Sequence, residues 1–330
     1  MKKFLKILKY SSLTLLVLVA AFLIYALTRS GTKYETPYPE ITAGKDSSLI
    51  ARGKYLVYGP AHCVDCHAPS KDFKRVEAGE EVLLSGGNFF DLPIGKIYVP
   101  NITPDNSTGI GSYTDGEIAR TLRYGVKKNN EALMDFMPFY DISNEDLRAI
   151  ISFLRSEKAV NNPVPKNKWT FMGKIVKALG MIKPMGDGIV PESPTPDTTA
   201  EYGKYIAGSI ANCRGCHTKR DLMTGAYIGP EYAGQMTLEV LNENHQVIED
   251  KHLVTPNLTP DRETGRIFYW DQETFIKRIR QGRIIAGSPM PWEAFSRMSE
   301  RDLKALYKFF KSLKPVSSKT PSGVQEGAPE

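Results

Sequence analysis

Residues 61–70, AHCVDCHAPS, and residues 211–220, ANCRGCHTKR, decide how the rest of this sequence is interpreted. Each stretch holds two cysteines separated by two residues, with a histidine directly after the second cysteine. The chain has 330 residues and four cysteines, and all four lie in these two stretches. Because no cysteine is left over for a structural disulfide, the cysteines serve the chemistry of the repeated pattern.

The repeat extends beyond the cysteines and predicts two copies of one domain, at residues 46–160 and 198–315. Each copy closes on an amphipathic helix that begins at Ser143 or Ser299, with an acidic residue three positions later as in a capping box. Strand signals are sparse, so a mainly α fold is expected, with long loops that need a large apolar cofactor as their core. The matching stretches are RGKYLVYGPAHC and YGKYIAGSIANC, VPNITPDNSTG and TPNLTPDRETG, IARTLRYG and FIKRIRQG, and FMPF and SPMPW.

Residues 1–30 predict a membrane anchor. Four lysines precede residue 10, and residues 10–28 carry no charge, which is long enough to span a bilayer. The positive-inside rule keeps the lysines in the cytoplasm, so a single-pass inner-membrane protein with periplasmic domains is expected. A cleaved signal peptide is the alternative. The net charge of +6 lies entirely within residues 1–33, which argues against a nucleic-acid partner.

Residues 161–197 are rich in proline and predict a linker between the domains. Inside this linker, WTFMGKIVKALGMI places Phe171, Ile175, Leu179 and Ile182 on one face of an amphipathic helix. That helix either packs across the two domains or docks on a membrane surface or a partner subunit. Residues 316–330 are polar and predict a disordered tail.

The Cys-x-x-Cys-His pattern is the attachment signature of c-type haem. The two sulfurs bond to the edge of the porphyrin, and the histidine ligates its iron. The pattern therefore predicts two haem c groups, held by Cys63, Cys66, Cys213 and Cys216, with His67 and His217 as iron ligands. A zinc site would have to join cysteine pairs from separate domains. A thioredoxin-like redox pair lacks its usual βαβ context.

The sixth ligand of each iron separates a closed electron carrier from an open catalytic site. Met137 and Met290 occupy matching places after their cysteines, and both precede proline, which holds the preceding residue extended. Met134 competes with Met137, because it and Met290 both lie nine residues before the serine that opens the closing helix. The remaining histidines fit the repeat less well; they are His62, His245 and His252.

Two further pairs of repeated residues are candidates for positioning the haem. The Pro-Asn pairs at 100–101 and 256–257 either supply the carbonyl that orients the ligand histidine or form a plain turn. Arg123 and Arg280 either pair with haem propionates or lie on a solvated helix face. The aromatic residues Tyr55, Tyr205 and Trp292 are expected to pack.

These residues together resemble the class I cytochrome c domains of membrane-bound, multi-haem cytochromes. The likeness rests on CVDCH, on PNITPDNSTGIGSYTDGEIARTLRYG, and on MPF with SNEDLRAIISFLRS. More narrowly, the chain resembles the cytochrome subunits of periplasmic alcohol, aldehyde and sugar-acid dehydrogenases. The resemblance implies small helices around each haem, thioether bonds at the four cysteines, proximal ligands at His67 and His217, and distal ligands at Met137 and Met290. The chain differs from those subunits in two ways. It has two haem motifs where many of them have three, and its anchor is N-terminal.

We therefore expect a di-haem cytochrome of a respiratory chain, an electron-transfer protein rather than an enzyme in its own right. It would take electrons from a periplasmic dehydrogenase and pass them to a terminal oxidase or another cytochrome. The main alternative is a di-haem peroxidase with one open iron site, for which His252 serving one iron would be the distinguishing feature. A haem-based sensor is a weaker alternative.

Overall fold

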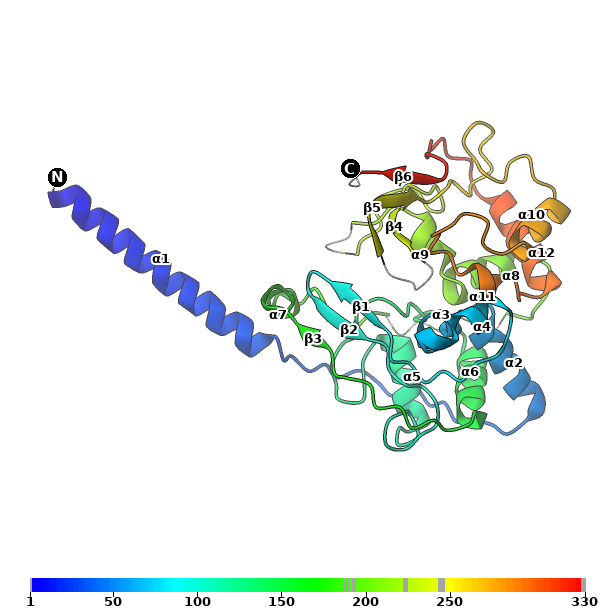
Figure 1. The fold of residues 1–330 in the computed structure, drawn as a ribbon, viewed down its shortest axis with the longest axis horizontal. Helices are drawn as coiled ribbons and strands as arrows, with labels where there is room; N and C mark the ends of the chain where they lie inside the picture. Colours follow the sequence, from blue (N-terminus) through cyan, green and yellow to red (C-terminus); the bar gives the residue numbers. More distant parts are fainter. Residues whose placement is uncertain are drawn as a thin grey trace.

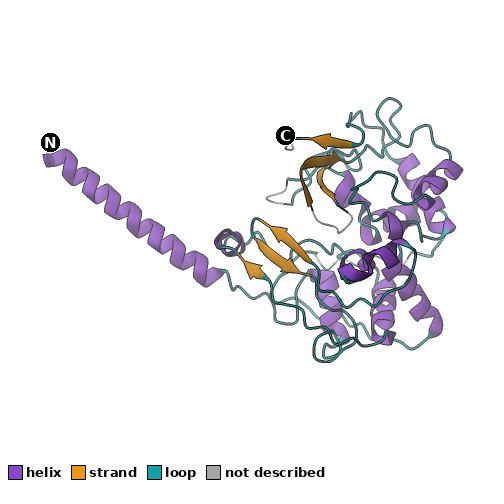
Figure 2. Cartoon of the chain, viewed as in Figure 1, coloured by secondary structure: helices purple, strands orange, loops and turns teal. Residues whose placement is uncertain are grey.

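The computed structural model describes residues 2–186, 188, 190–191, 194–221, 225–242 and 247–327. One long helix projects from a body of short helices, two small sheets and long loops (Figure 1, Figure 2). The helices are α1 (Lys2–Arg29), α2 (Ser47–Tyr58), α3 (Cys63–His67), η1 (Ser70–Asp72), α4 (Phe73–Glu77), α5 (Asp115–Tyr124), α6 (Asn144–Ser156), α7 (Phe171–Ala178), α8 (Ala200–Tyr205), η2 (Ile206–Ile210), α9 (Cys213–His217), α10 (Gln272–Arg280), α11 (Trp292–Phe295) and α12 (Glu300–Ser312). The strands are β1 (Phe89–Leu92), β2 (Gly95–Tyr98), β3 (Lys168–Trp169), β4 (Thr237–Leu241), β5 (Val247–Val254) and β6 (Val324–Glu326).

Helix α1 extends away from the body, and Ala26 is its one buried residue among those described (Figure 1). Its leucine, valine and phenylalanine side chains are mostly exposed on all sides. In the part of the chain that the structure describes, α1 is the one helix long and apolar enough to cross a membrane. This is the geometry expected of residues 1–30 as either an anchor or a signal segment.

The internal repeat is visible in the structure as two pairs of packed helices. In the first half, residues 46–160, α2 packs on α6, and in the second half, residues 198–315, α8 packs on α12. Glycine sits at both crossings: a Cβ on Gly53 would lie 1.9 Å from the carbonyl oxygen of Ala149, and one on Gly203 would lie 2.1 Å from that of Ala305. Only glycine permits so close a backbone approach.

Tyrosines join the two halves by completing each other's helix caps. Ser143 opens α6, and its Oγ accepts the N–H of Asp146. In a capping box the acidic side chain would bond directly to the N–H of the serine. Here the hydroxyl of Tyr205, from the second half, lies between them: it accepts the N–H of Ser143 (3.0 Å) and donates to the Asp146 carboxylate (2.9 Å). The hydroxyl of Tyr55 makes the same bonds to Ser299 (2.9 Å) and Asp302 (2.6 Å) of α12.

Tyr55 and Tyr205 therefore form hydrogen bonds in addition to packing. These bonds hold the two halves against each other. The buried apolar side chains of both halves form one continuous cluster. Within the first half, Arg52 makes a bidentate ion pair to Asp146, with Nε and Nη2 at 2.8 and 3.0 Å from its carboxylate oxygens. The same Nη2 donates to the Tyr202 hydroxyl of the second half at 3.4 Å. Burial and the Asp302 carboxylate raise the pKa of Tyr55, so its hydroxyl stays protonated as a donor.

Two antiparallel three-stranded sheets, ordered β1-β2-β3 and β4-β5-β6, exceed what the sparse strand signals predict. The tail prediction for residues 316–330 is wrong over β6, which pairs with β5 through Leu253 and Val324. It is also wrong near residue 316, whose carbonyl accepts a bond from Asn257. Residues 328–330 lie outside the described part. Strand β3 comes from the linker and pairs with β2, which ties that segment to the first half.

Helix α7 is the helix expected within the linker, but within the described part of the chain its main packing partners include no helix or strand of the second half. Its neighbours are α1 and β3. Thr170 caps its N-terminus by accepting the N–H of Gly173 at 3.2 Å. The Tyr25 hydroxyl of α1 donates to the carbonyl of Ala178 at 3.4 Å.

Candidate functional site

Each Cys-x-x-Cys-His motif forms a one-turn helix, α3 or α9. The two cysteines and the histidine occupy positions i, i+3 and i+4 of that turn, which lie on one face of a helix. Both turns start from a left-handed residue, His62 with φ 40° and Asn212 with φ 48°. This conformation is uncommon outside glycine, although asparagine and histidine adopt it more readily than most residues. The local sequence therefore places two cysteines and one histidine on the same short helix in each half.

The imidazoles of His67 and His217 are buried and held by backbone carbonyls. The Nδ1 of His67 lies 2.9 Å from the carbonyl oxygen of Pro100, and that of His217 lies 3.0 Å from that of Pro256. A carbonyl only accepts, so Nδ1 carries the proton and Nε2 keeps a free lone pair. Burial lowers the pKa of His67 to about 4, so the ring is neutral, as an iron ligand must be. The expectation that the Pro-Asn pairs supply these carbonyls is confirmed.

The asparagine after each of these prolines fixes the loop that carries the carbonyl. Asn101 is buried, and its Nδ2 donates to Thr108 Oγ1 (3.1 Å) and to the carbonyl of Val160 (2.7 Å). Its Oδ1 accepts the N–H of Thr103 at 3.0 Å. The same bonds connect Asn257 with Thr264, Val316 and Thr259. The carbonyls that orient the histidines therefore belong to loops that buried, hydrogen-bonded asparagines hold in place.

Glycines behind the histidines complete this support, and the sequence interpretation missed them. The N–H of Gly86 donates to the carbonyl of His67, and that of Gly234 to the carbonyl of His217, both at 2.8 Å. A Cβ on Gly86 would lie 2.4 Å from the Pro100 carbonyl oxygen, in a backbone with φ +64°. The recurrence of a glycine at a similar distance after each motif was the signal available in the sequence.

Gly86→Ala is expected to destabilise the protein far more than Gly125→Ala. Both residues have φ near +63°, but nothing lies within 4 Å of a Cβ on Gly125. The left-handed backbone costs about 1–2 kcal/mol in either variant. The clash at Gly86 adds about 1–3 kcal/mol, because the carbonyl that holds His67 must move. Urea unfolding of the full chain measures the difference, and equal losses would contradict the close approach.

No disulfide joins any of the four cysteines. Burial raises the pKa of Cys63 and of Cys213 to about 12, so neither is a reactive thiolate. Among the described residues, which include all four cysteines, no three His, Cys, Asp or Glu side chains are gathered to hold a metal ion. The two cysteine pairs are therefore not gathered with each other in the structure.

The loops that carry Met137 and Met290 have the same local structure. Both side chains are half-buried and pack against the core. Each methionine carbonyl accepts the N–H two residues later, from Phe139 at 2.9 Å and from Trp292 at 2.7 Å. The intervening Pro291 has φ −73° and ψ 64°, an inverse γ-turn. Met134 is also half-buried, and its carbonyl likewise accepts the N–H of Phe136 at 2.7 Å, so this bond does not distinguish it from Met137. Of the two, only Met137 is followed by proline, as Met290 is.

Arginines contact the backbone beside both methionine loops. The solvated helix face expected for the two repeated arginines is confirmed for Arg280, which is exposed, and is wrong for Arg123. Arg123 is 1% exposed and donates to the carbonyls of Tyr140 (2.8 Å) and Ile142. Arg280 donates to the carbonyl of Ser296. Arg283 pairs with Glu293 at 2.7 Å and clamps the loop around Met290. These guanidinium groups hold the backbone beside the methionines.

Each methionine loop also touches the cysteine segment of the opposite half. Phe295, five residues after Met290, packs edge-to-face on His62 with ring centroids 5.5 Å apart. Asp135, two residues before Met137, pairs with Arg220 at 3.2 Å, three residues after His217. The two candidate sites therefore adjoin the interface between the halves.

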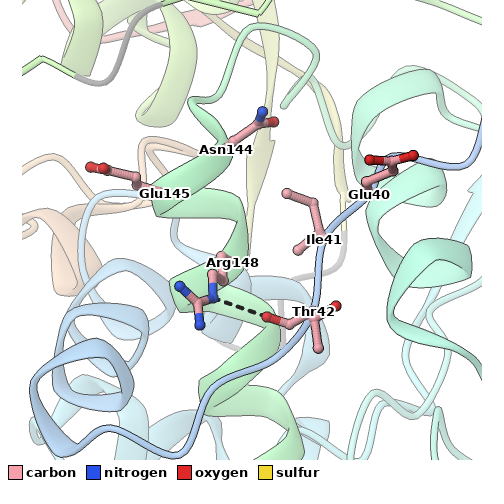
Figure 3. Close-up of a pocket in the computed structure, with 6 residues that line it drawn as sticks. All are labelled: Glu40, Ile41, Thr42, Asn144, Glu145 and Arg148. Atoms are coloured by element: carbon pink, nitrogen blue, oxygen red, sulfur yellow. Dashed lines mark hydrogen bonds between the residues drawn. The ribbon is translucent and has the colours of Figure 1, made fainter.

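The remaining candidates lie elsewhere. His252 is on β5, and its Nδ1 is 3.0 Å from the carbonyl of Gly327. His245 lies outside the described residues. A pocket of about 340 Å³ opens between residues 40–42 and the start of α6, where Arg148 donates to the carbonyl of Thr42 (Figure 3). Its lining contains no cysteine, histidine or methionine.

The donor set fits covalently bound haem in each half. Two un-ionised thiols one helical turn apart suit thioether formation, and a neutral imidazole offers a free Nε2 to iron. A braced methionine loop offers a thioether sulfur. The residues present are therefore of the kinds that hold a c-type haem.

No family model matches the chain. Among curated proteins it is 27% identical over 325 residues to the fructose dehydrogenase cytochrome subunit of Gluconobacter japonicus, covering 93% of this chain and 60% of that protein. It is 28% identical to the cytochrome c subunit of the quinone alcohol dehydrogenase of Gluconobacter oxydans, covering 86% of this chain and 58% of that protein. It is 28% identical to a di-haem c-type cytochrome of Cereibacter sphaeroides, covering 56% of this chain and 61% of that protein.

The homologues are thus cytochrome c subunits of dehydrogenases and a di-haem cytochrome c. They support an electron-transfer role rather than a catalytic one. The chain spans about 60% of the length of the curated relatives it matches.

Proposed function

We propose that this chain is a di-haem c-type cytochrome with two tandem class I domains, at residues 46–160 and 198–315, that relays single electrons. The observation that carries the proposal is the recurrence of one complete donor arrangement in both halves. In each, a cysteine pair, a carbonyl-held neutral histidine and a braced Met-Pro loop occupy matching places.

Cys63 and Cys66 would hold one haem, and Cys213 and Cys216 the other. His67 and His217 would ligate the iron from one side, and Met137 and Met290 from the other. When bound, the haem supplies an iron that cycles between Fe(II) and Fe(III). The carbonyls of Pro100 and Pro256 fix the imidazole orientation, and the thioether ligands favour a high reduction potential.

Closed ligation at both irons suits electron transfer better than peroxidase chemistry. The histidine that would distinguish a peroxidase, His252, is engaged with Gly327 near the described end of the chain. The cross-half contact of His62 with Phe295 supports transfer between the two haems, because it joins the motif of one half to the methionine loop of the other.

We further propose that α1 anchors the protein in the inner membrane with its body on the periplasmic side. The length and apolarity of α1 and the lysines before it support this orientation. The names of the relatives support a dehydrogenase as the electron donor. A terminal oxidase or another cytochrome would then be the acceptor.

Production of the full chain with the c-type haem maturation machinery is expected to give two covalent haems per chain. A Cys213→Ala/Cys216→Ala double variant should carry one haem, because its second thioether pair is absent. Cys63→Ala/Cys66→Ala is the matched variant of the other half and should also carry one. Intact-mass analysis and the pyridine-haem spectrum measure the number. A wild-type chain without any attached macrocycle would disprove the proposal.

A further inference from the structure

Helix α7 reverses the usual burial of an amphipathic helix. Its smallest residues face the protein: Gly173 and Ala178 are buried. A Cβ on Gly173 would lie 2.0 Å from the carbonyl oxygen of Ile94, so this contact admits only glycine. Three large apolar residues face outward, with Phe171 54% exposed, Met172 56% and Leu179, just beyond the helix, 56%, while Ile175 and Val176 are half-buried and Ile182 is buried. A water-facing helix normally shows the opposite arrangement.

The segment that contains α7 carries charge of one sign in its sequence, and the acidic residue that reaches it from elsewhere is Glu131, near Lys177. Residues 166–183 contain five lysines and no aspartate or glutamate. Lys174 is exposed beside the outward apolar residues, and Lys177 lies over the Trp169 ring at 5.1 Å. Apolar side chains combined with lysines are the composition of a helix that lies on an anionic lipid surface.

The position of α7 places this surface at the end of the candidate membrane span. The Tyr25 hydroxyl, near the C-terminal end of α1, donates to the carbonyl of Ala178. The hydroxyl of Tyr34 donates to the carbonyl of Ile182 at 3.1 Å. Tyr25 lies four residues before Arg29, the first charge after the apolar run, which is the interfacial level where tyrosines gather. Figure 2 shows α1 lengthwise and α7 end-on, so the axis of α7 runs across the axis of α1.

We propose that α7 lies along the outer membrane–water interface, with Phe171, Met172 and Leu179 among lipid chains and its lysines at anionic headgroups. The inference rests on the membrane anchor of the proposed function. If α1 crosses the bilayer, a helix packed across its outer end lies parallel to the membrane plane. Because β3 directly precedes α7 and pairs with β2, this contact holds the first half at the bilayer in one orientation.

The test uses the full chain in vesicles of phosphatidylcholine mixed with phosphatidylglycerol, with a photo-crosslinking residue at single positions. Met172→benzoylphenylalanine should form phospholipid adducts after irradiation, and Tyr269→benzoylphenylalanine, at a position 77% exposed in the second half, should form none. Leu16→benzoylphenylalanine, within α1, reports on the anchor. Adduct yield at position 172 should fall several-fold in phosphatidylcholine alone.

The outcomes separate the two proposals. Lipid adducts at positions 16 and 172 but not at 269 support the inference. Adducts at 16 alone overturn it and leave the anchor intact, whereas absence at both positions overturns the anchor as well. Crosslinks from position 172 to a second copy of the chain overturn it in favour of a protein contact. A yield that is the same in both vesicle types overturns the role of the lysines.

Discussion

Replacing Met290 with histidine is expected to lower the midpoint potential of one proposed haem by on the order of 200 mV or more. A thioether stabilises Fe(II), whereas a second imidazole favours Fe(III). At 59 mV per tenfold change for one electron, such a drop shifts the distribution of an electron between the two haems by about three powers of ten. A potentiometric titration of the full chain, followed by absorption, measures both potentials.

Met298→Leu is the matched control for this substitution. Met298 is 2% exposed in the core between α11 and α12, so its replacement should leave both potentials unchanged. The same experiment in the first half decides between two candidates, because Met137→His should lower the other potential and Met134→His should not. If Met290→His left both potentials where they are in the wild type, Met290 would not be a ligand.

Replacing Asp146 with alanine is expected to cost about 3–5 kcal/mol of the free energy of unfolding. The Asp146 side chain is 10% exposed and receives two bonds from Arg52 and one from Tyr205. Its removal leaves a largely buried guanidinium unpaired and the Tyr205 hydroxyl without its carboxylate. The loss falls on the interface between the halves, and urea unfolding of the full, haem-loaded chain measures it.

Glu145 provides the control for this prediction, because it is the exposed neighbour in the same first turn of α6. Glu145→Ala removes the same kind of charge from the helix N-terminus and should cost less than about 1 kcal/mol. Tyr205→Phe removes only the relayed hydroxyl and should cost about 1 kcal/mol. Equal stability of the Asp146→Ala and Glu145→Ala variants would show that the stability of the fold does not depend on this ion pair.

The parts of the site that sequence could predict are those set by local spacing. A cysteine pair followed by histidine puts three side chains on one helical turn whatever surrounds it. The Pro-Asn pairs were recognisable because both halves repeat them, and the structure confirms their carbonyls as partners of His67 and His217. The assignment of the cysteines, histidines and methionines to haem stays a prediction.

The parts that sequence could not supply depend on contacts between distant segments. Strand β3 is two residues long and exists because β2 pairs with it. Arg123 looks like a surface residue in its helix and is buried only because the loop after Met137 folds over it. Tyr55 resembles a packing residue until α12 of the other half presents Ser299 to its hydroxyl. None of these partners can be paired from spacing alone.

The tyrosine bonds between the halves also set an order for the steps of folding during synthesis. A polypeptide emerges from synthesis N-terminus first, so α6 forms before Tyr205 is available to finish its cap. Cys63 is likewise exposed to modifying enzymes before Phe295 arrives to pack on its neighbour His62. Assembly is therefore expected to end with the second half closing over the first, and a nascent chain arrested before residue 205 should remain open to proteases.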